Sequence, residues 1–431
     1  MNAIIQKLIG SKGIQQSAIT IIGNISATGL SAISLILISR ILGPEKFGAF
    51  NIGFALVLII IKLNDFGISA ATIRLAASTS DKNIINSVFS VAIRYKFYLT
   101  ALITPLGILA SPFLAKLIRF DQPEIIATAF LFGIIATYYE QLLIMLQSIH
   151  LFSQAVVANA IQASIKLIMA LALMIIGTHN VTLIFSLYII APISPILFIR
   201  WLLPKWVSLK KTKHTLDISR ELKHLSLHFS LALLSAGIIE NIDVFFIQRS
   251  LSTYETGLYS GVSRISMVFA LIAYSMGNVL YPRVAKYKNK DHLQSYLKKA
   301  FGVVLLCFVG FLLFLPFAKW IIYFTIGTEY LSGLLIMNIL VLSSFLAIAS
   351  IPFIALFYSL NAHWYFSISA IFQLLIVLIG NFIFVPLIGL PAAAWTRLAV
   401  RLFLFIFTLI TGLLLYKKQY VEKTETTFNH A

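Results

Sequence analysis

Charged residues are scarce in this sequence. Only 11% of its 431 residues are Asp, Glu, Lys or Arg, whereas 59% are hydrophobic. A soluble globular protein carries about 25% charged residues, so the composition excludes a soluble fold. The mean hydropathy of +0.94 agrees, and apolar runs recur that are each long enough to cross a hydrocarbon core of about 30 Å. Because the bilayer offers no hydrogen-bond partners, we expect these runs to be helices.

Cysteine and nucleotide-binding motifs are also missing. With the single cysteine Cys307, the chain cannot form an internal disulfide or a thiolate metal site. The sequence contains neither GxxxxGK[ST], the phosphate-binding loop of ATPases, nor the zinc motif HExxH. We therefore predict no metal, no cofactor and no enzymatic activity. The N-terminal segment MNAIIQKLIGSKG lacks a cleavage site and is interpreted as a cytoplasmic lead-in.

The apolar runs predict an all-α polytopic membrane protein with about twelve transmembrane helices. The predicted spans lie near 15–39, 48–70, 94–115, 124–147, 154–176, 181–201, 227–248, 258–281, 300–324, 333–358, 364–386 and 391–416. Most of the 33 basic residues, among them Lys96 at the start of the third span, fall in connections on the side that also holds both termini. Because basic loops stay in the cytoplasm, both termini are predicted to be cytoplasmic. The net charge of +18 is then a signal of topology, and no nucleic-acid partner is expected.

A repeat divides the chain into two halves. RILGPEKFGAF at 40–50 and RSLSTYETGLY at 249–259 share Arg, Leu and Gly at matching positions. The predicted domains are an N-terminal six-helix half (1–201), a basic cytoplasmic linker (202–226), a C-terminal six-helix half (227–416) and a cytoplasmic tail (417–431). Both copies begin at an odd-numbered span, so the halves are predicted to be parallel repeats around a central cavity, an arrangement typical of transporters that work by alternating access.

Ionisable residues inside the spans are the candidate functional residues, since a charge at the bilayer centre costs about 2.5–3.5 kcal/mol. The candidates for binding an anionic substrate are Lys62, Lys166, Arg264, Arg397 and Arg401. The candidates for ion coupling or structural pairing are Asp65, Glu140, Glu240 and Asp243. Arg397 and Arg401 lie one turn apart without an acid on their own helix, and arginine binds phosphate in a bidentate manner. The alternative is structural pairing of Lys62 with Asp65 and of Glu140 with Lys166.

Two stretches resemble a known family. SRILGPEKFGAF, followed after an apolar span by LNDFGISAATIRLAA, resembles the start of Wzx-type polysaccharide flippases. These belong to the polysaccharide transporter family of the multidrug/oligosaccharidyl-lipid/polysaccharide exporter superfamily. ENIDVFFIQRSLSTYETGLYSGVSRISMVF resembles the seventh and eighth spans of that family, including the buried Asp (here Asp243) and the corner Gly257–Leu258–Tyr259. The similar stretches cover about a quarter of the chain.

The resemblance implies a flippase for undecaprenyl-diphosphate-linked oligosaccharide repeat units, in the bacterial inner membrane, serving the synthesis of O-antigen or another surface polysaccharide. It also implies membrane lipids as partners, with a polysaccharide polymerase and a chain-length regulator as further candidate partners. Aromatic residues that could stack on sugars are Tyr138, Tyr139, Tyr274 and Trp395.

Three alternatives remain. A cation-coupled multidrug exporter of the same superfamily would need a dominant acidic site, whereas the charges within the spans are mixed here. A lipid II flippase usually has additional C-terminal spans. A polymerase or ligase would have a long periplasmic loop, whereas the outer connections here are short.

Overall fold

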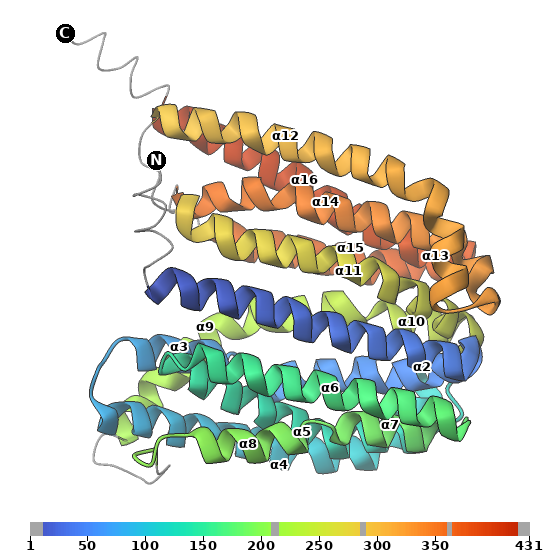
Figure 1. The fold of residues 1–431 in the computed structure, drawn as a ribbon, viewed down its shortest axis with the longest axis horizontal. Helices are drawn as coiled ribbons and strands as arrows, with labels where there is room; N and C mark the ends of the chain where they lie inside the picture. Colours follow the sequence, from blue (N-terminus) through green and yellow to red (C-terminus); the bar gives the residue numbers. More distant parts are fainter. Residues whose placement is uncertain (1–11, 208–214, 285–289, 360–363, 421–431) are drawn as a thin grey trace. The chain divides into compact units, whose positions relative to one another are not determined.

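The fold is all-helical. A computed structural model describes residues 12–207, 215–284, 290–359 and 364–420, and no strand occurs among them (Figure 1). The helices are α2 Lys12–Asp65, α3 Ile68–Ala77, α4 Lys82–Leu117, α5 Pro123–Ser148, α6 Phe152–Ile176, α7 Val181–Ile190, α8 Ile193–Leu202, α9 Thr215–Asn241, α10 Asp243–Ser250, α11 Thr253–Val284, α12 Lys290–Phe314, α13 Ala318–Thr325, α14 Leu334–Ser359, α15 Trp364–Ile388 and α16 Leu390–Tyr420, with 3₁₀ turns at Leu315–Phe317 and Thr328–Gly333. Each predicted span lies mostly in these helices, with short breaks such as Phe66–Gly67 and Ala191–Pro192 inside some of them. The predicted fold class is confirmed.

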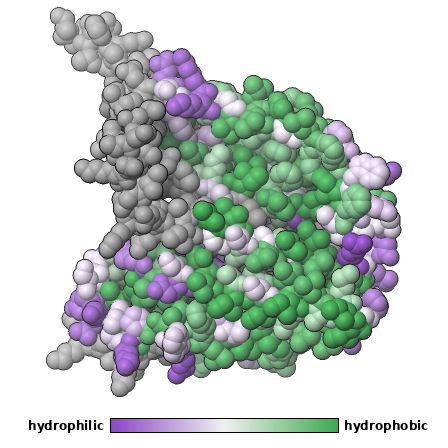
Figure 2. Space-filling view, in the orientation of Figure 1, coloured by the Kyte–Doolittle hydropathy of each residue, from purple (hydrophilic) through white to green (hydrophobic). Residues whose placement is uncertain are grey.

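The surface of the described helices is that of a membrane protein. Large apolar side chains are exposed, among them Leu109 (78%), Ile175 (87%) and Leu387 (75%). Figure 2 shows hydrophobic residues over most of the described face, with hydrophilic residues gathered toward the helix ends. Ten helical segments among the described residues are long and apolar enough to cross a membrane. The chain is therefore a multi-pass membrane protein.

The first two predicted spans are joined by a kink. α2 runs through both of them and departs from helical geometry at Gly43, which has φ 68° and ψ 174°. Glycine adopts this positive φ without steric cost, and Pro44, which lacks an amide hydrogen, is tolerated directly after such a break. The break that the sequence predicts between the first two spans is therefore present, since helical geometry is interrupted at Gly43 between two helical segments of α2.

The two repeated corners touch each other. A Cβ atom added at Gly48 would lie 2.0 Å from the carbonyl oxygen of Thr253, and one added at Gly257 would lie 1.6 Å from the carbonyl oxygen of Pro44. Each glycine thus faces the carbonyl group four residues before the other glycine. Only residues without a side chain allow the two backbones this approach.

The chain forms two compact units, Met1–Gly257 and Leu258–Ala431. In the first unit, α9 packs against α2, α3 and α4. In the second unit, α14 packs against α12 and α16, and the Tyr296 hydroxyl donates a 3.0 Å hydrogen bond to the Pro352 carbonyl oxygen. The division by packing thus comes later in the chain than the predicted boundary between the repeats, because α9 and α10 pack with the N-terminal helices.

Part of the predicted linker is helical. α9 begins at Thr215, and Ile218 and Leu222 on its first turns are buried among α3 and α4. The Ser219 side chain also shares a 2.6 Å hydrogen bond with the Tyr95 hydroxyl. These apolar residues four positions apart give the segment a buried face, which explains why it extends the helix. Residues 208–214 of the linker and 421–431 of the predicted tail lie outside the described residues.

Candidate functional site

A break in the helix places the first charged group. α2 ends at Asp65, and the chain turns through Phe66 and Gly67, with φ of 41° and 82°, before α3 begins at Ile68. A Cβ atom at Gly67 would lie 2.4 Å from the Ser226 carbonyl oxygen of α9, so the turn requires glycine. The Asp65 carboxylate accepts hydrogen bonds from the Ser69 backbone N–H, at 3.1 Å, and from the Ser69 hydroxyl. It thereby binds a backbone donor in the first turn of α3 that would otherwise have no partner.

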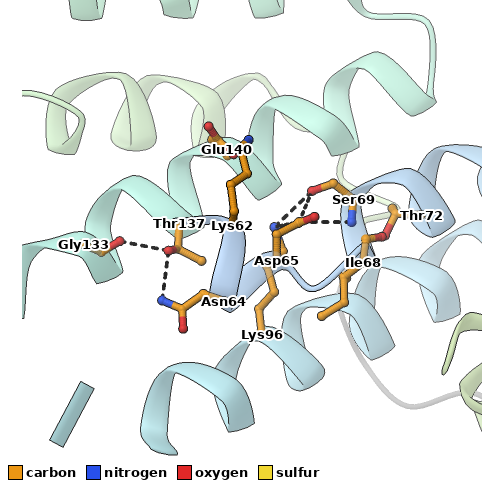
Figure 3. Close-up of polar contacts among 10 residues, drawn as sticks. All are labelled: Lys62, Asn64, Asp65, Ile68, Ser69, Thr72, Lys96, Gly133, Thr137 and Glu140. Carbon is orange, nitrogen blue, oxygen red and sulfur yellow. Dashed lines mark hydrogen bonds and ion pairs between the residues drawn. The ribbon is translucent and has the colours of Figure 1, made fainter. Parts of the chain in front are cut away.

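Asp65 forms a buried ion pair with Lys96 of α4. The Nζ atom of Lys96 lies 2.7 Å from Oδ1 of Asp65, and the two side chains are 1% and 7% exposed. Lys96 also donates a 3.1 Å hydrogen bond to the Ser69 hydroxyl, which closes a triad of Asp65, Ser69 and Lys96 (Figure 3). A buried pair with additional hydrogen bonds offsets much of the cost of desolvating both charges.

Lys96 is a residue that the sequence analysis missed. The prediction placed it on the cytoplasmic side at the start of a span, whereas α4 begins at Lys82 and contains Lys96 in its buried face. Thr100 and Thr104, which follow at intervals of four, are also buried. This polar stripe at helical spacing was the available signal that Lys96 faces other helices and not the cytoplasm.

The Lys62–Glu140 pair corrects the predicted pairing. The Nζ atom of Lys62 lies 3.6 Å from Oε2 of Glu140, with side chains 41% and 38% exposed (Figure 3). The predicted partners of the two carboxylates are therefore wrong: Asp65 pairs with Lys96, and Glu140 pairs with Lys62. The helix break after Asp65 turns this carboxylate toward α3 and α4. Lys62 therefore pairs with Glu140 of the neighbouring helix α5.

A cavity of about 230 Å³ lies within the first unit, between α2, α5, α6 and α7. Its polar lining consists of Tyr139 and Glu140 from α5, of Asn159, Gln162 and Lys166 from α6, and of Tyr188 from α7. The three α6 residues follow at intervals of three and four, so they share one face of the helix. Tyr139, Glu140 and Lys166 were candidates from the sequence. The two amides were not, since an uncharged polar residue gives little signal in a helix.

Tyr188 of α7 fixes the end of Lys166. The ammonium group of Lys166 lies 4.5 Å from the centre of the Tyr188 ring, a distance at which the ring attracts a cation. Phe50 and Phe54 form T-shaped contacts with the same ring, at centroid distances of 5.6 and 5.7 Å. Tyr188 is consequently held in place and positions the lysine at the wall of the cavity.

The remaining candidates occupy other helices. In the first unit, Asp243 begins α10 and is 1% exposed, whereas Glu240 near the end of α9 is exposed. In the second unit, Arg264 of α11 is 7% exposed. Arg397 and Arg401 lie on consecutive turns of α16 and are partly buried.

Two contacts involve these arginines. Nη1 of Arg264 lies 3.2 Å from Sδ of Met267, and the Ser343 hydroxyl donates a 3.4 Å hydrogen bond to the backbone carbonyl of Arg397. The five candidate cations are thus divided between the units, with Lys62 and Lys166 in the first and the three arginines in the second. Among the described residues, no group of three His, Cys, Asp or Glu could hold a metal ion.

The fold is similar to that of solved transporter structures. One is a multidrug resistance MATE family transporter of the MOP superfamily in an inward-facing conformation, with 17% identity and a TM-score of 0.75, covering 91% of this chain and 95% of that chain. Another is the lipid II flippase MurJ in an inward closed conformation, with 15% identity and a TM-score of 0.74, covering 94% of this chain and 91% of that chain. At such identities the likeness shows the fold alone.

The family follows from the sequence match. No curated protein matches this chain. Residues 14–288 match the family described as polysaccharide biosynthesis protein. The matched region is more than half of the chain and contains the whole of the first unit from residue 14 onward, including the triad of Asp65, Ser69 and Lys96 and the cavity beside Lys166. The chain therefore belongs to the polysaccharide biosynthesis protein family.

Proposed function

We propose that this protein is a flippase that moves an undecaprenyl-diphosphate-linked oligosaccharide from the cytoplasmic to the periplasmic leaflet of the bacterial inner membrane. It works by alternating access, with both termini in the cytoplasm, and serves the synthesis of O-antigen or another surface polysaccharide. The observation that carries the proposal is the family match over residues 14–288 in a chain folded like membrane transporters and a lipid flippase.

Physical chemistry supports the same substrate. A glycan and a diphosphate cannot cross hydrocarbon without a polar path, because each desolvated polar group costs several kcal/mol. Arg397 and Arg401 place two guanidinium groups on consecutive turns of α16, and arginine binds phosphate oxygens with two parallel hydrogen bonds. We assign these two residues, with Arg264, to the diphosphate.

Deletion of the gene in its own host tests the proposal. A flippase for surface polysaccharide predicts loss of that polysaccharide and accumulation of lipid-linked repeat units in the cytoplasmic leaflet, with unchanged susceptibility to drugs. Intact polysaccharide together with increased drug susceptibility would instead identify a multidrug exporter. Accumulation of peptidoglycan precursors with cell lysis would identify a lipid II flippase.

The arginine pair provides a sharper test in the deleted strain. Arg397→Ala and Arg401→Ala are each expected to abolish restoration of surface polysaccharide while the protein remains at its normal level in the membrane. Lys319→Ala is the matched control, since Lys319 is exposed near the start of α13 and is not assigned to the substrate. Normal polysaccharide in both arginine variants would contradict the assignment.

Asp243 is our candidate for coupling transport to an ion gradient. It is almost fully buried at the first turn of α10, and a carboxylate in such surroundings can exchange a proton or sodium ion during a conformational change. Asp243→Asn is expected to retain folding and to lose the dependence of transport on the proton or sodium gradient. The measurement is translocation in proteoliposomes with an imposed gradient. Full gradient-dependent translocation by the variant would exclude Asp243 as the coupling group.

A further inference from the structure

The cavity beside Lys166 has an excess of positive charge. Glu140 is the only acidic residue in its lining, and its charge is matched by Lys62 at 3.6 Å. Lys166 has no carboxylate within ion-pair distance among the described residues, and its ammonium group lies over the Tyr188 ring. The three charged groups therefore sum to one positive charge, carried by a lysine that lines the cavity. An occupant with one negative charge would neutralise it.

The neutral polar groups beside Lys166 are suited to hydroxyl groups. Gln162 lies one turn from Lys166 on α6, and its amide has no hydrogen-bond partner in the described part of the chain. Asn159, one turn further, accepts a 2.7 Å hydrogen bond from the Tyr139 hydroxyl and donates one of 3.2 Å to the Asn24 side chain. These bonds fix the Asn159 side chain at the wall of the cavity. An amide offers both donors and an acceptor, as the hydroxyl groups of a sugar require.

The volume of the cavity suits a single ring of a larger substrate. At about 230 Å³, the cavity is smaller than the roughly 300–1,000 Å³ of pockets that enclose drug-sized ligands. It has room for about one ring and not for a repeat unit of several sugars. A diphosphate would also be poorly matched, because it carries more than one negative charge and the cavity offers one uncompensated cation.

We propose that the Lys166 cavity binds one sugar ring that bears a carboxylate, so that the transported glycan contains a residue of the uronic acid type. The proposal rests on the proposed function for its sugar class. Lys166 forms the ion pair with the carboxylate, and the Gln162 amide binds ring hydroxyls. The Glu140 carboxylate, already paired with Lys62, accepts from a further hydroxyl.

Binding of free monosaccharides tests the proposal without any transport step. The purified full-length chain in lipid nanodiscs is titrated with D-glucuronate, D-glucose, acetate and pyrophosphate, and binding is followed by calorimetry. We expect D-glucuronate to bind roughly tenfold or more tightly than D-glucose or acetate, because only it offers both the charge and the hydroxyl groups. Pyrophosphate is expected to bind at the arginines assigned to the diphosphate, so its affinity is expected to stay the same in Lys166→Met. Equal or tighter binding of acetate or D-glucose, or loss of pyrophosphate binding in Lys166→Met, would overturn the proposal.

Substitutions in the cavity test whether Lys166 supplies its one uncompensated positive charge. Lys166→Met is expected to weaken D-glucuronate binding roughly tenfold or more, as loss of a charge-assisted hydrogen bond predicts. Glu140→Gln is expected to tighten it, because Lys62 then adds a second uncompensated positive charge. Lys116→Met, which alters an exposed lysine outside the lining, is expected to leave it unchanged.

Each result of the variants decides the proposal. If Lys166→Met fails to fold, the Glu140→Gln titration decides alone, and unchanged or weaker binding there overturns the proposal. Unchanged D-glucuronate binding in a folded Lys166→Met variant would do the same. The gene deletion described above has a separate readout in cells. Failure of the flippase function would therefore be seen apart from failure of D-glucuronate binding.

Discussion

Gly257→Ala is expected to prevent the protein from folding stably in the membrane. The added methyl group would lie 1.6 Å from the Pro44 carbonyl oxygen and 2.8 Å from the Gly48 backbone nitrogen. These are backbone atoms of the first corner and cannot turn aside as a flexible side chain can. Overpacking a well-packed site costs roughly 1–3 kcal/mol, and we expect this substitution at or above the upper end of that range.

The measurement is the yield of monodisperse protein and its melting temperature in detergent, by size-exclusion chromatography after heating. Gly29→Ala is the matched control, because Gly29 lies in α2 and a Cβ atom there has nothing within 4 Å. Alanine is favoured over glycine within a helix by about 1 kcal/mol, so this variant is expected to be at least as stable as the original. A Gly257→Ala protein with the stability of the control would refute the close contact between the corners.

Lys96→Met is expected to produce the second large loss of stability. It leaves the Asp65 carboxylate buried without its counter-charge, and removal of one partner of a buried pair costs about 3–5 kcal/mol. The Lys62–Glu140 pair is the internal comparison, since it has the same chemistry with side chains 41% and 38% exposed. Lys62→Met is therefore expected to lower the melting temperature far less than Lys96→Met.

A double variant distinguishes two effects of Lys96→Met: the unpaired charge of the Asp65 carboxylate and the lost packing of the Lys96 side chain. Asp65→Asn combined with Lys96→Met removes both charges, and the asparagine oxygen can still accept the hydrogen bond from the Ser69 backbone N–H. We expect the double variant to be more stable than Lys96→Met alone, measured by the same heating assay. Two results would show that the Asp65–Lys96 pair does not stabilise the fold. One is a double variant that is no more stable than Lys96→Met, and the other is the same melting temperature for Lys96→Met and Lys62→Met.

The spans could be predicted from the sequence, but not every joint between them. Long apolar runs such as 154–176 define a helix because only a helix satisfies its backbone in lipid, and α6 covers Phe152–Ile176. Gly43 and Pro44 predict a break in any helix, and helical geometry is interrupted at Gly43. Thr215 begins a helix within a basic segment because Ile218 and Leu222 become buried, which depends on helices distant in sequence.

The charged residues of the site were visible in the sequence, and their partners were not. The cost of a charge in lipid singles out Lys62, Asp65, Glu140 and Lys166 because they lie inside apolar runs of the sequence. Helical spacing states which residues share a face and not which neighbouring helix lies opposite. The helix break at Phe66 and Gly67 decides that Asp65 meets Lys96. Asn159 and Gln162 carry no such cost and became visible only as the lining of a cavity.

The contact between the two corners has the form of an isologous interface, the kind that joins identical subunits across a two-fold axis. The Pro44 carbonyl oxygen of the first corner faces Gly257, and the Thr253 carbonyl oxygen of the second corner faces Gly48. Between Gly43–Gly48 and Ser252–Gly257 only the final glycine is the same in both, yet the exchange of glycine and carbonyl group is kept. A bulkier residue at either glycine would therefore disturb the contact at both corners.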